Sequence, residues 1–165
     1  MKIDRVIVGP LEENCYIVTK NNKTIIIDPG DEAEKIIAAC QNKNVVGVLI
    51  THHHFDHIGA LKEIENYFKI KESKIIDGFN YQVIEVPGHS SDSVVYYFKD
   101  DKVMFVGDFI FLNSIGRTDL PSGSAKEMIK SLELIKNYPD DIVLYPGHGD
   151  FTTLGYEKSN FKYYY

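Results

Sequence analysis

The six histidines of this chain are confined to three places, each at the end of an apolar run that is typical of a buried strand. Four of them lie within residues 51–59, which follow the apolar run 45–50. His89 and His148 each end a Pro-Gly-His sequence that follows another apolar run. Any fold of this chain must therefore bring imidazoles to the ends of several strands. Because imidazole is the commonest metal ligand in proteins, this distribution indicates a metal site.

Length and composition are those of an ordinary globular protein. The chain has 165 residues, of which 44% are hydrophobic and 25% charged, and this length suits one domain. The net charge of −6, without clusters of lysine or arginine, argues against a nucleic-acid partner. Neither a signal peptide nor a membrane-spanning run is visible, so we expect no membrane partner. Cys15 and Cys40 form no Cys-x-x-Cys pair and are expected to be core thiols, which favours a cytoplasmic location.

Alternation and turn residues predict strands at residues 2–8, 15–19, 24–28, 45–50, 74–76, 81–86, 93–98, 103–106 and 142–145. Asp100-Asp101 predicts a hairpin turn between residues 93–98 and 103–106. Capping boxes at residues 31–34 and 124–127 predict helices that run to about Gln41 and to Pro139. A third helix, capped by Asp56, has apolar positions at helical spacing through Phe68. Strands with interspersed helices predict an α+β fold of two sheets between helices.

The loop at residues 51–59 can serve two metal ions. Successive side chains of an extended loop alternate in direction, so His52 and His54 point the same way and can share one metal, whereas His53 points elsewhere. We expect His53 to lie behind the ligands or to face solvent. Asp56 and His57, at the start of a helix, turn toward a different point and suit a second metal.

Asp108, at the end of the strand that begins at residue 103, is the natural bridge because a carboxylate has two oxygens. His89 and His148 then add one imidazole to each site. Imidazole and carboxylate without thiolate suit zinc, iron or manganese, and we expect two divalent ions, zinc in the first place. A single histidine after a strand is usually an ordinary surface residue, but the joint pattern of separate segments favours metal binding.

These residues carry a family resemblance. Residues 51–57, Thr-His-His-His-Phe-Asp-His, resemble the His-x-His-x-Asp-His signature of the metallo-beta-lactamase fold. The segment Gly-Asp-Phe-Ile-Phe at 107–111 and Ser-Ile-Gly-Arg-Thr-Asp-Leu-Pro at 114–121 looks like the glyoxalase II (hydroxyacylglutathione hydrolase) branch, as do residues 14–16, 27–30, 146–149, 152–155 and 157–158. The resemblance covers nearly the whole chain. It implies an αββα sandwich, two mixed sheets between helices, with the metals at one edge.

Carried over by position, the resemblance implies a first metal site of His52, His54 and His89 and a second of Asp56, His57 and His148, bridged by Asp108. It also implies that Asp28 supports the histidine loop from behind. Arg117 matches an arginine of the family's Gly-Arg-Thr-Asp run. We expect a structural role for it, with substrate contact as the alternative.

The chain departs from the longer family members in two ways. It ends at Tyr165, so we expect residues 1–165 to be a single domain without the helical C-terminal domain that supplies glutathione contacts in longer hydroxyacylglutathione hydrolases. The resemblance is therefore to the short, single-domain glyoxalase II-like proteins. The span between His57 and His89 is also short for the family, which predicts a more open pocket.

The resemblance and the ligand set together predict a dinuclear metal-dependent hydrolase of a small-molecule thioester or related acyl ester. Its nucleophile is expected to be a metal-bridging hydroxide, which exists at neutral pH because metals lower the pKa of bound water. Asp56 is the expected proton carrier. One alternative is a mononuclear non-haem iron persulfide dioxygenase, which shares the motif, and another is a metal-binding domain of little catalytic activity. Asp108 stands where common zinc beta-lactamases place a cysteine, which argues against lactamase activity.

Overall fold

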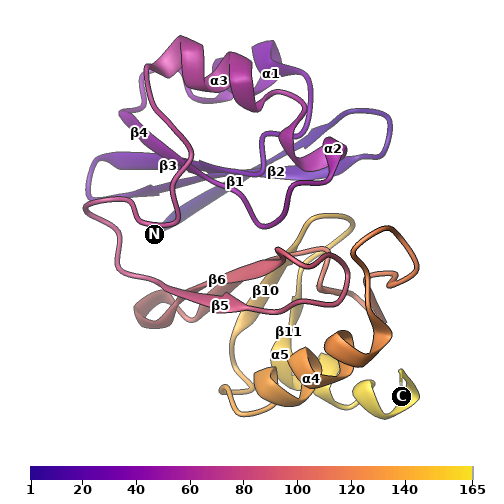
Figure 1. Ribbon diagram of the computed structural model, residues 1–165. Helices are drawn as coiled ribbons and strands as arrows, with labels where there is room; N and C mark the ends of the chain where they lie inside the picture. Colours follow the sequence, from indigo (N-terminus) through magenta and orange to yellow (C-terminus); the bar gives the residue numbers. More distant parts are fainter. Residues whose placement is uncertain (165) are drawn as a thin grey trace. The chain divides into compact units, whose positions relative to one another are not determined.

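A computed structural model describes residues 1–164 of the protein (Figure 1). The chain forms two compact units, Met1–Phe79 and Asn80–Tyr165. Of the terminal tyrosines, Tyr163 ends the 3-10 helix η2 (Phe161–Tyr163), and Tyr165 lies outside the described residues. Within residues 1–164 no helix has both the length and the apolar character that crossing a membrane requires.

The N-terminal unit is built on a mixed sheet of order β1-β2-β3-β4. Its strands are β1 (Lys2–Val8), β2 (Glu13–Lys20), β3 (Lys23–Ile27) and β4 (Val45–Leu49). The first three pair antiparallel, and β4 pairs parallel to β3. Helices α1 (Ala33–Ala39) and α3 (Leu61–Phe68) cover one face of the sheet, where Ile36 and Ile64 pack on Ile17, Ile26 and Val48 (Figure 1).

Two predictions for this unit are wrong in detail. The single helix expected after Asp56 is divided into α2 (Phe55–Ile58) and α3. The division arises because the chain turns closely against the loop after β3: the Ala60 amide donates to the Pro29 carbonyl at 3.0 Å, and a side chain at Gly59 would meet the Gly30 carbonyl.

Residues 74–76 form no strand, although the sequence predicts one. The Ser73 hydroxyl bonds both the amide and the carbonyl of Ile75, so local turn bonds occupy the backbone groups that a sheet would need. Ile76 packs against Gly47 of β4, where a Cβ atom would lie 2.5 Å from its Cδ1.

The C-terminal unit is built on a second mixed sheet, of order β11-β10-β7-β6-β5. Its strands are β5 (Gln82–Glu85), β6 (Val94–Phe98), β7 (Val103–Gly107), β10 (Val143–Pro146) and β11 (Thr152–Thr153). Only β10 and β7 pair parallel among these neighbours. The hairpin predicted between β6 and β7 is confirmed, and a 3-10 turn, η1 (Lys99–Asp101), closes it.

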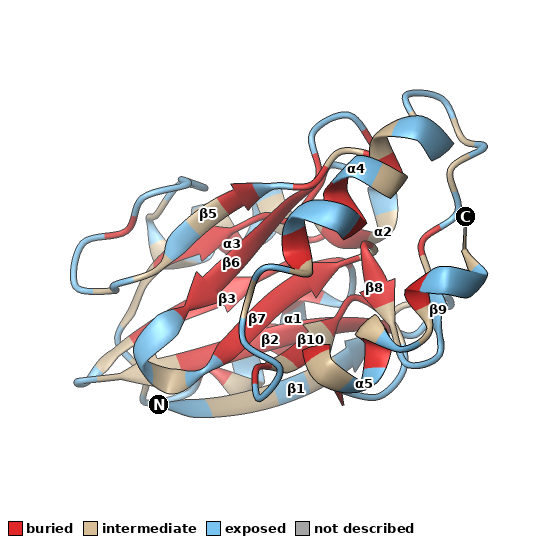
Figure 2. Ribbon diagram, turned by 90° about the horizontal axis from the view of Figure 1, so that it is seen from below, coloured by how far each residue is buried: buried red, intermediate tan, exposed pale blue. Residues whose placement is uncertain are grey.

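Helices α4 (Ala125–Ile135) and α5 (Leu154–Lys158) belong to this second unit. Met128, Leu132 and Ile135 of α4 pack on the sheet, whose residues are mostly buried (Figure 2). A short ribbon of β8 (Ile110–Phe111) and β9 (Ser114–Ile115) follows β7. The predicted two mixed sheets with accompanying helices are therefore present. The ends of β4, β7 and β10, and the loop after β5, carry the histidines and Asp108.

Candidate metal centre

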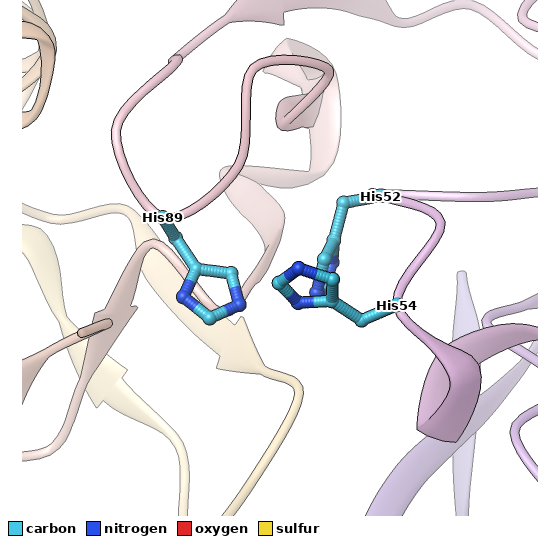
Figure 3. Close-up of side chains that lie close together, drawn as sticks. All are labelled: His52, His54 and His89. Carbon is cyan, nitrogen blue, oxygen red and sulfur yellow. The ribbon is translucent and has the colours of Figure 1, made fainter. Parts of the chain in front are cut away.

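The N-terminal unit presents four of the predicted ligands on the segment between β4 and the end of α2. Figure 3 shows His52 and His54 on this segment, and their ring centroids lie 4.7 Å apart. The rings of His52 and His57 lie 4.1 Å apart, and His57 Nε2 lies 3.8 Å from Asp56 Oδ2. His54 has the extended backbone (φ −66°, ψ 149°) on which the predicted alternation of side chains depends.

Asp28 orients this loop from the end of β3. Its carboxylate accepts hydrogen bonds from the backbone amide and the hydroxyl of Thr51, at 2.7 and 2.5 Å. Its Oδ2 also lies 2.9 Å from Nδ1 of His57. Because a carboxylate only accepts, Nδ1 of His57 carries the proton, and Nε2 keeps the lone pair that a metal needs. The Thr51 hydroxyl also lies 3.2 Å from Nδ1 of His52, so the ring of His52 is linked to Asp28 through Thr51.

Glu13 is a buried acidic residue that sequence reasoning missed. It begins β2, is only 1% exposed, and its Oε1 lies 3.8 Å from Nδ1 of His57. Glu13, Asp28 and His57 offer ligand atoms within 4.8 Å of one another. The available signal was a carboxylate shortly before the apolar run Cys15 to Val18 of β2, although the sequence does not show that it is buried.

The C-terminal unit presents the other three predicted ligands, Asp108 and His148 after β7 and β10 and His89 in the loop after β5. Asp108 Oδ2 lies 3.5 Å from Nε2 of His89 and 3.6 Å from Nε2 of His148. Donor atoms bound to one tetrahedral zinc at its usual bond lengths lie about 3.4 Å apart. Asp108 and His89 therefore have the spacing of two ligands of one metal, and so do Asp108 and His148. Asp108 therefore stands between two imidazoles, which is the placement of a carboxylate that serves two ions.

The backbone of Arg117 orients His89, whose ring Figure 3 shows on its loop. Nδ1 of His89 lies 2.9 Å from the Arg117 carbonyl, which can only accept, so Nδ1 carries the proton and Nε2 keeps the lone pair that a metal needs. The exposed Arg117 guanidinium makes two hydrogen bonds to Asp119, at 2.7 and 2.8 Å. These bonds lower the pKa of Asp119 to about 2. Arg117 thus contacts a predicted ligand through its carbonyl, and its side chain binds a neighbouring carboxylate.

The remaining predicted residues stand apart from the ligands. His53 is half exposed, and its Nε2 lies 3.3 Å from Glu72 Oε1. Cys15 and Cys40 are buried free thiols, as predicted, and burial raises the pKa of both. The predicted ligand sets therefore contain imidazole and carboxylate donors without thiolate, a chemistry that fits zinc, iron or manganese.

Comparison with known proteins identifies the family. A sequence model of the Metallo-beta-lactamase superfamily matches residues 8–77 and 71–148. The hydroxyacylglutathione hydrolase GloC of Haemophilus influenzae is 30% identical over 96% of this chain and 95% of its own length.

Two solved structures are similar over nearly the whole chain. The B3 metallo-beta-lactamase BLEG-1 has a TM-score of 0.90 and 27% identity over 99% of both chains. A protein called TTHA1623, solved in a di-iron-bound form, has a TM-score of 0.84 and 31% identity over 93% of this chain and 96% of its own. The predicted α+β fold with mixed sheets is thereby confirmed, and the chain belongs to the metallo-beta-lactamase superfamily.

Proposed function

We propose that the protein is a dinuclear metal-dependent hydrolase of thioesters or related acyl esters. The observation that carries this proposal is the Asp108 carboxylate, whose Oδ2 lies 3.5 and 3.6 Å from the Nε2 atoms of two histidines. A carboxylate in that position can be shared by two cations. The likeness to a hydroxyacylglutathione hydrolase at 30% identity supports the thioester as the substrate class.

In this proposal His52, His54 and His89 hold one metal, Asp56, His57 and His148 hold the other, and Asp108 serves both. Ring orientation within each unit supports the assignment, because Asp28 and the Arg117 carbonyl leave Nε2 of His57 and of His89 as ligand atoms. We expect zinc, with iron as the first alternative because imidazole and carboxylate donors accept both metals.

Bound divalent ions would supply a hydroxide nucleophile at neutral pH and a Lewis acid for the carbonyl oxygen. The chain itself provides orientation and proton transfer. Asp28 and Thr51 hold the histidine loop through three hydrogen bonds. Asp56, whose side chain is 13% exposed, accepts the proton of the nucleophile. A thiolate leaves without a strong general acid, since an ordinary thiol has a pKa of about 8.5. Cys15 and Cys40 are buried, which argues against a thiol nucleophile.

The test combines elemental analysis with hydrolysis of S-lactoylglutathione. We expect two metals per chain and measurable turnover. Asp56→Ala and His148→Ala should lower kcat/KM by more than the roughly 100-fold that is typical of residues behind the ligands. His53→Ala is the matched control, because His53 is half exposed and lies against Glu72, and it should keep both metals and activity.

Two results would overturn the proposal. Full turnover from a His148→Ala protein that holds one metal would exclude the two-metal mechanism. A single iron, with oxygen consumption in the presence of a persulfide and no thioester hydrolysis, would identify a dioxygenase instead.

A further inference from the structure

A cavity of about 140 Å³ lies in the N-terminal unit directly beside Asp56. Three segments line it: the turn between β1 and β2, the loop after β3, and α2 with the glycine that follows it. Figure 1 shows α2 in this unit beside β2, and His57 of α2 lies 3.8 Å from Glu13, which begins β2. The cavity therefore adjoins the proposed reaction centre through a residue that we assign to the second metal.

The walls of this cavity are largely apolar. Val8, which is 1% exposed, forms part of the lining, together with Pro10 and two exposed apolar side chains, Leu11 (51%) and Phe55 (74%). Its volume is close to that of an engineered cavity of about 150 Å³ that binds benzene. A group of about six carbon atoms therefore matches it in size.

One acidic residue in the lining disfavours anions. Asp31 and Asp56 both line the cavity, and because we assign Asp56 to a metal, Asp31 is the lining residue whose negative charge is not shared with a cation. Asp31 lies against the turn, where a Cβ atom at Gly9 would be 3.0 Å from its Oδ2. An acyl chain that ends in a carboxylate would meet like charge here, whereas an uncharged apolar chain would not.

The cavity is preformed because the segments that carry its lining residues are held together by hydrogen bonds beside it. The Gly9 amide donates to Glu32 Oε2 at 2.9 Å, and Lys35 Nζ donates to the Ile7 carbonyl at 2.6 Å. On the other side, Gly30 and Gly59 permit a backbone approach that any side chain would obstruct, since a Cβ atom at Gly30 would lie 1.8 Å from the Asp56 carbonyl. A preformed apolar pocket with few polar groups is the usual form of a small-molecule subsite.

We propose that this cavity binds a small, uncharged, apolar group, and that in the hydrolase this group is the side chain of the acyl moiety. The second part rests on the proposed function and adds a substrate class to it. Thioesters of short aliphatic or aromatic acids, up to about the size of benzoyl, are then better substrates than hydroxyacyl or dicarboxylic thioesters. A lactoyl hydroxyl would lose water against Val8 and Leu11, and that desolvation is unfavourable.

The first arm of the test is a substrate series on one neutral thiol, N-acetylcysteamine, carrying lactoyl, butanoyl, benzoyl and succinyl groups. We expect kcat/KM for benzoyl and butanoyl to exceed that for lactoyl by about tenfold, and succinyl to be the poorest. Leu11→Trp, which fills the cavity from an exposed turn, should lower the benzoyl-to-lactoyl ratio about tenfold. Ile75→Ala is the control, because Ile75 is 84% exposed in the same unit and does not line the cavity.

The second arm measures binding without catalysis. Benzamide added to the metal-loaded protein should shift the NMR resonances of the Gly9, Leu11 and Asp56 amides, and Leu11→Trp should abolish those shifts. Equal or better hydrolysis of lactoyl than of benzoyl, or the absence of benzamide shifts at these amides, would overturn the inference. Benzamide shifts without hydrolysis of any thioester would overturn the hydrolase proposal and would retain the cavity as an apolar ligand site.

Discussion

Asp28 Oδ2 lies 2.9 Å from Nδ1 of His57, and both side chains are buried. The same carboxylate holds the amide and hydroxyl of Thr51, the residue that begins the histidine segment. One acidic group at the end of β3 therefore fixes both the start of the ligand loop and the ring orientation of a proposed ligand.

Asp28→Asn should weaken metal binding by about 10- to 100-fold, the usual effect of changing a group that orients a ligand histidine. An asparagine has one acceptor oxygen and a donating amide, so it cannot accept from the Thr51 backbone amide on one side and from Nδ1 of His57 on the other. Competition for zinc with a chromophoric chelator measures the change. Asp77→Asn, at a fully exposed side chain, should bind zinc as the parent protein does. Equal affinity in the two variants would show that Asp28 does not orient the ligands.

Gly116→Ala should destabilise the C-terminal unit and displace Asp108. A Cβ atom at residue 116 would lie 1.8 Å from the Asp108 carbonyl, so the backbone must move, with an expected loss of about 3 kcal/mol. Gly149→Ala is the matched control: its φ is +75° but no atom lies within 4 Å of its added Cβ, so only backbone strain of about 1 kcal/mol remains. Urea denaturation compares the two. Similar urea midpoints for the two variants would mean that the loop of Asp108 accommodates the added Cβ atom at no extra cost in stability.

Local sequence signals predicted a helix cap correctly where no distant segment of the described chain formed hydrogen bonds with the capping side chains. The capping box at residues 124–127 forms in part, because Ser124 Oγ accepts from the Glu127 amide at 3.3 Å. The box expected at residues 31–34 does not form, since α1 begins after Glu32, which has φ 48° and makes no side-chain cap. Glu32 instead accepts from the distant Gly9 amide, a bond that the sequence cannot reveal because it depends on where the β1–β2 turn lies.

The candidate ligands could be predicted because metal chemistry restricts residue type and strand ends restrict position. The groups behind them could not. Glu13 lies beside His57 only because β2 is in the middle of the sheet, and the Arg117 carbonyl reaches His89 only because the chain folds back after β9. A backbone carbonyl also leaves no signal in residue type, so the contact with His89 is invisible in the sequence even though Arg117 was singled out.

Arg117 should control the titration of Asp119. The pKa of Asp119 is lowered from its ordinary 3.8 to about 2, first by the hydrogen bonds from the guanidinium. Because the folded pKa is depressed, the pair stabilises the fold above pH 3.8 and loses that contribution as the pH falls through about 2. An NMR titration of the Asp119 carboxyl should therefore show a midpoint near 2, and Arg117→Gln should return it toward 3.8.

The same variant separates the backbone of Arg117 from its side chain. Arg117→Gln keeps the carbonyl that accepts from His89, so metal content should not change. Loss of metal in this variant would assign the guanidinium a role at the site. Lys136→Gln, which removes a cation from a pair with Glu133, is the control and should leave the Asp119 midpoint unchanged.

Glu157 should be a main determinant of stability in the C-terminal unit. It is fully buried in α5, and its carboxylate accepts from the Thr152 hydroxyl at 2.7 Å, from the Asn113 amide at 3.2 Å and from the Asn160 side chain at 3.3 Å. Glu157→Leu removes the acceptor for all three donors and should reduce the free energy of unfolding by about 3 kcal/mol. Glu157→Gln keeps one acceptor oxygen and should lose about 1 kcal/mol.

Two measurements test this hydrogen-bond network. Urea denaturation reports the stability of the whole fold, and hydrogen exchange at the Asn113 amide reports the stability of the local turn. Asn113 lies in the turn between β8 and β9 with φ 61°, and its amide should exchange faster in Glu157→Leu because the amide loses its acceptor, although Tyr156 of α5 still donates to the Asn113 side chain. Glu133→Leu, at a half-exposed glutamate of α4, should stay within about 0.5 kcal/mol of the parent protein. If Glu157→Leu were no less stable than Glu133→Leu, the ribbon of β8 and β9, which carries Phe111 beside His148, would have to be held by its packing and by the hydrogen bond from Tyr156 to Asn113.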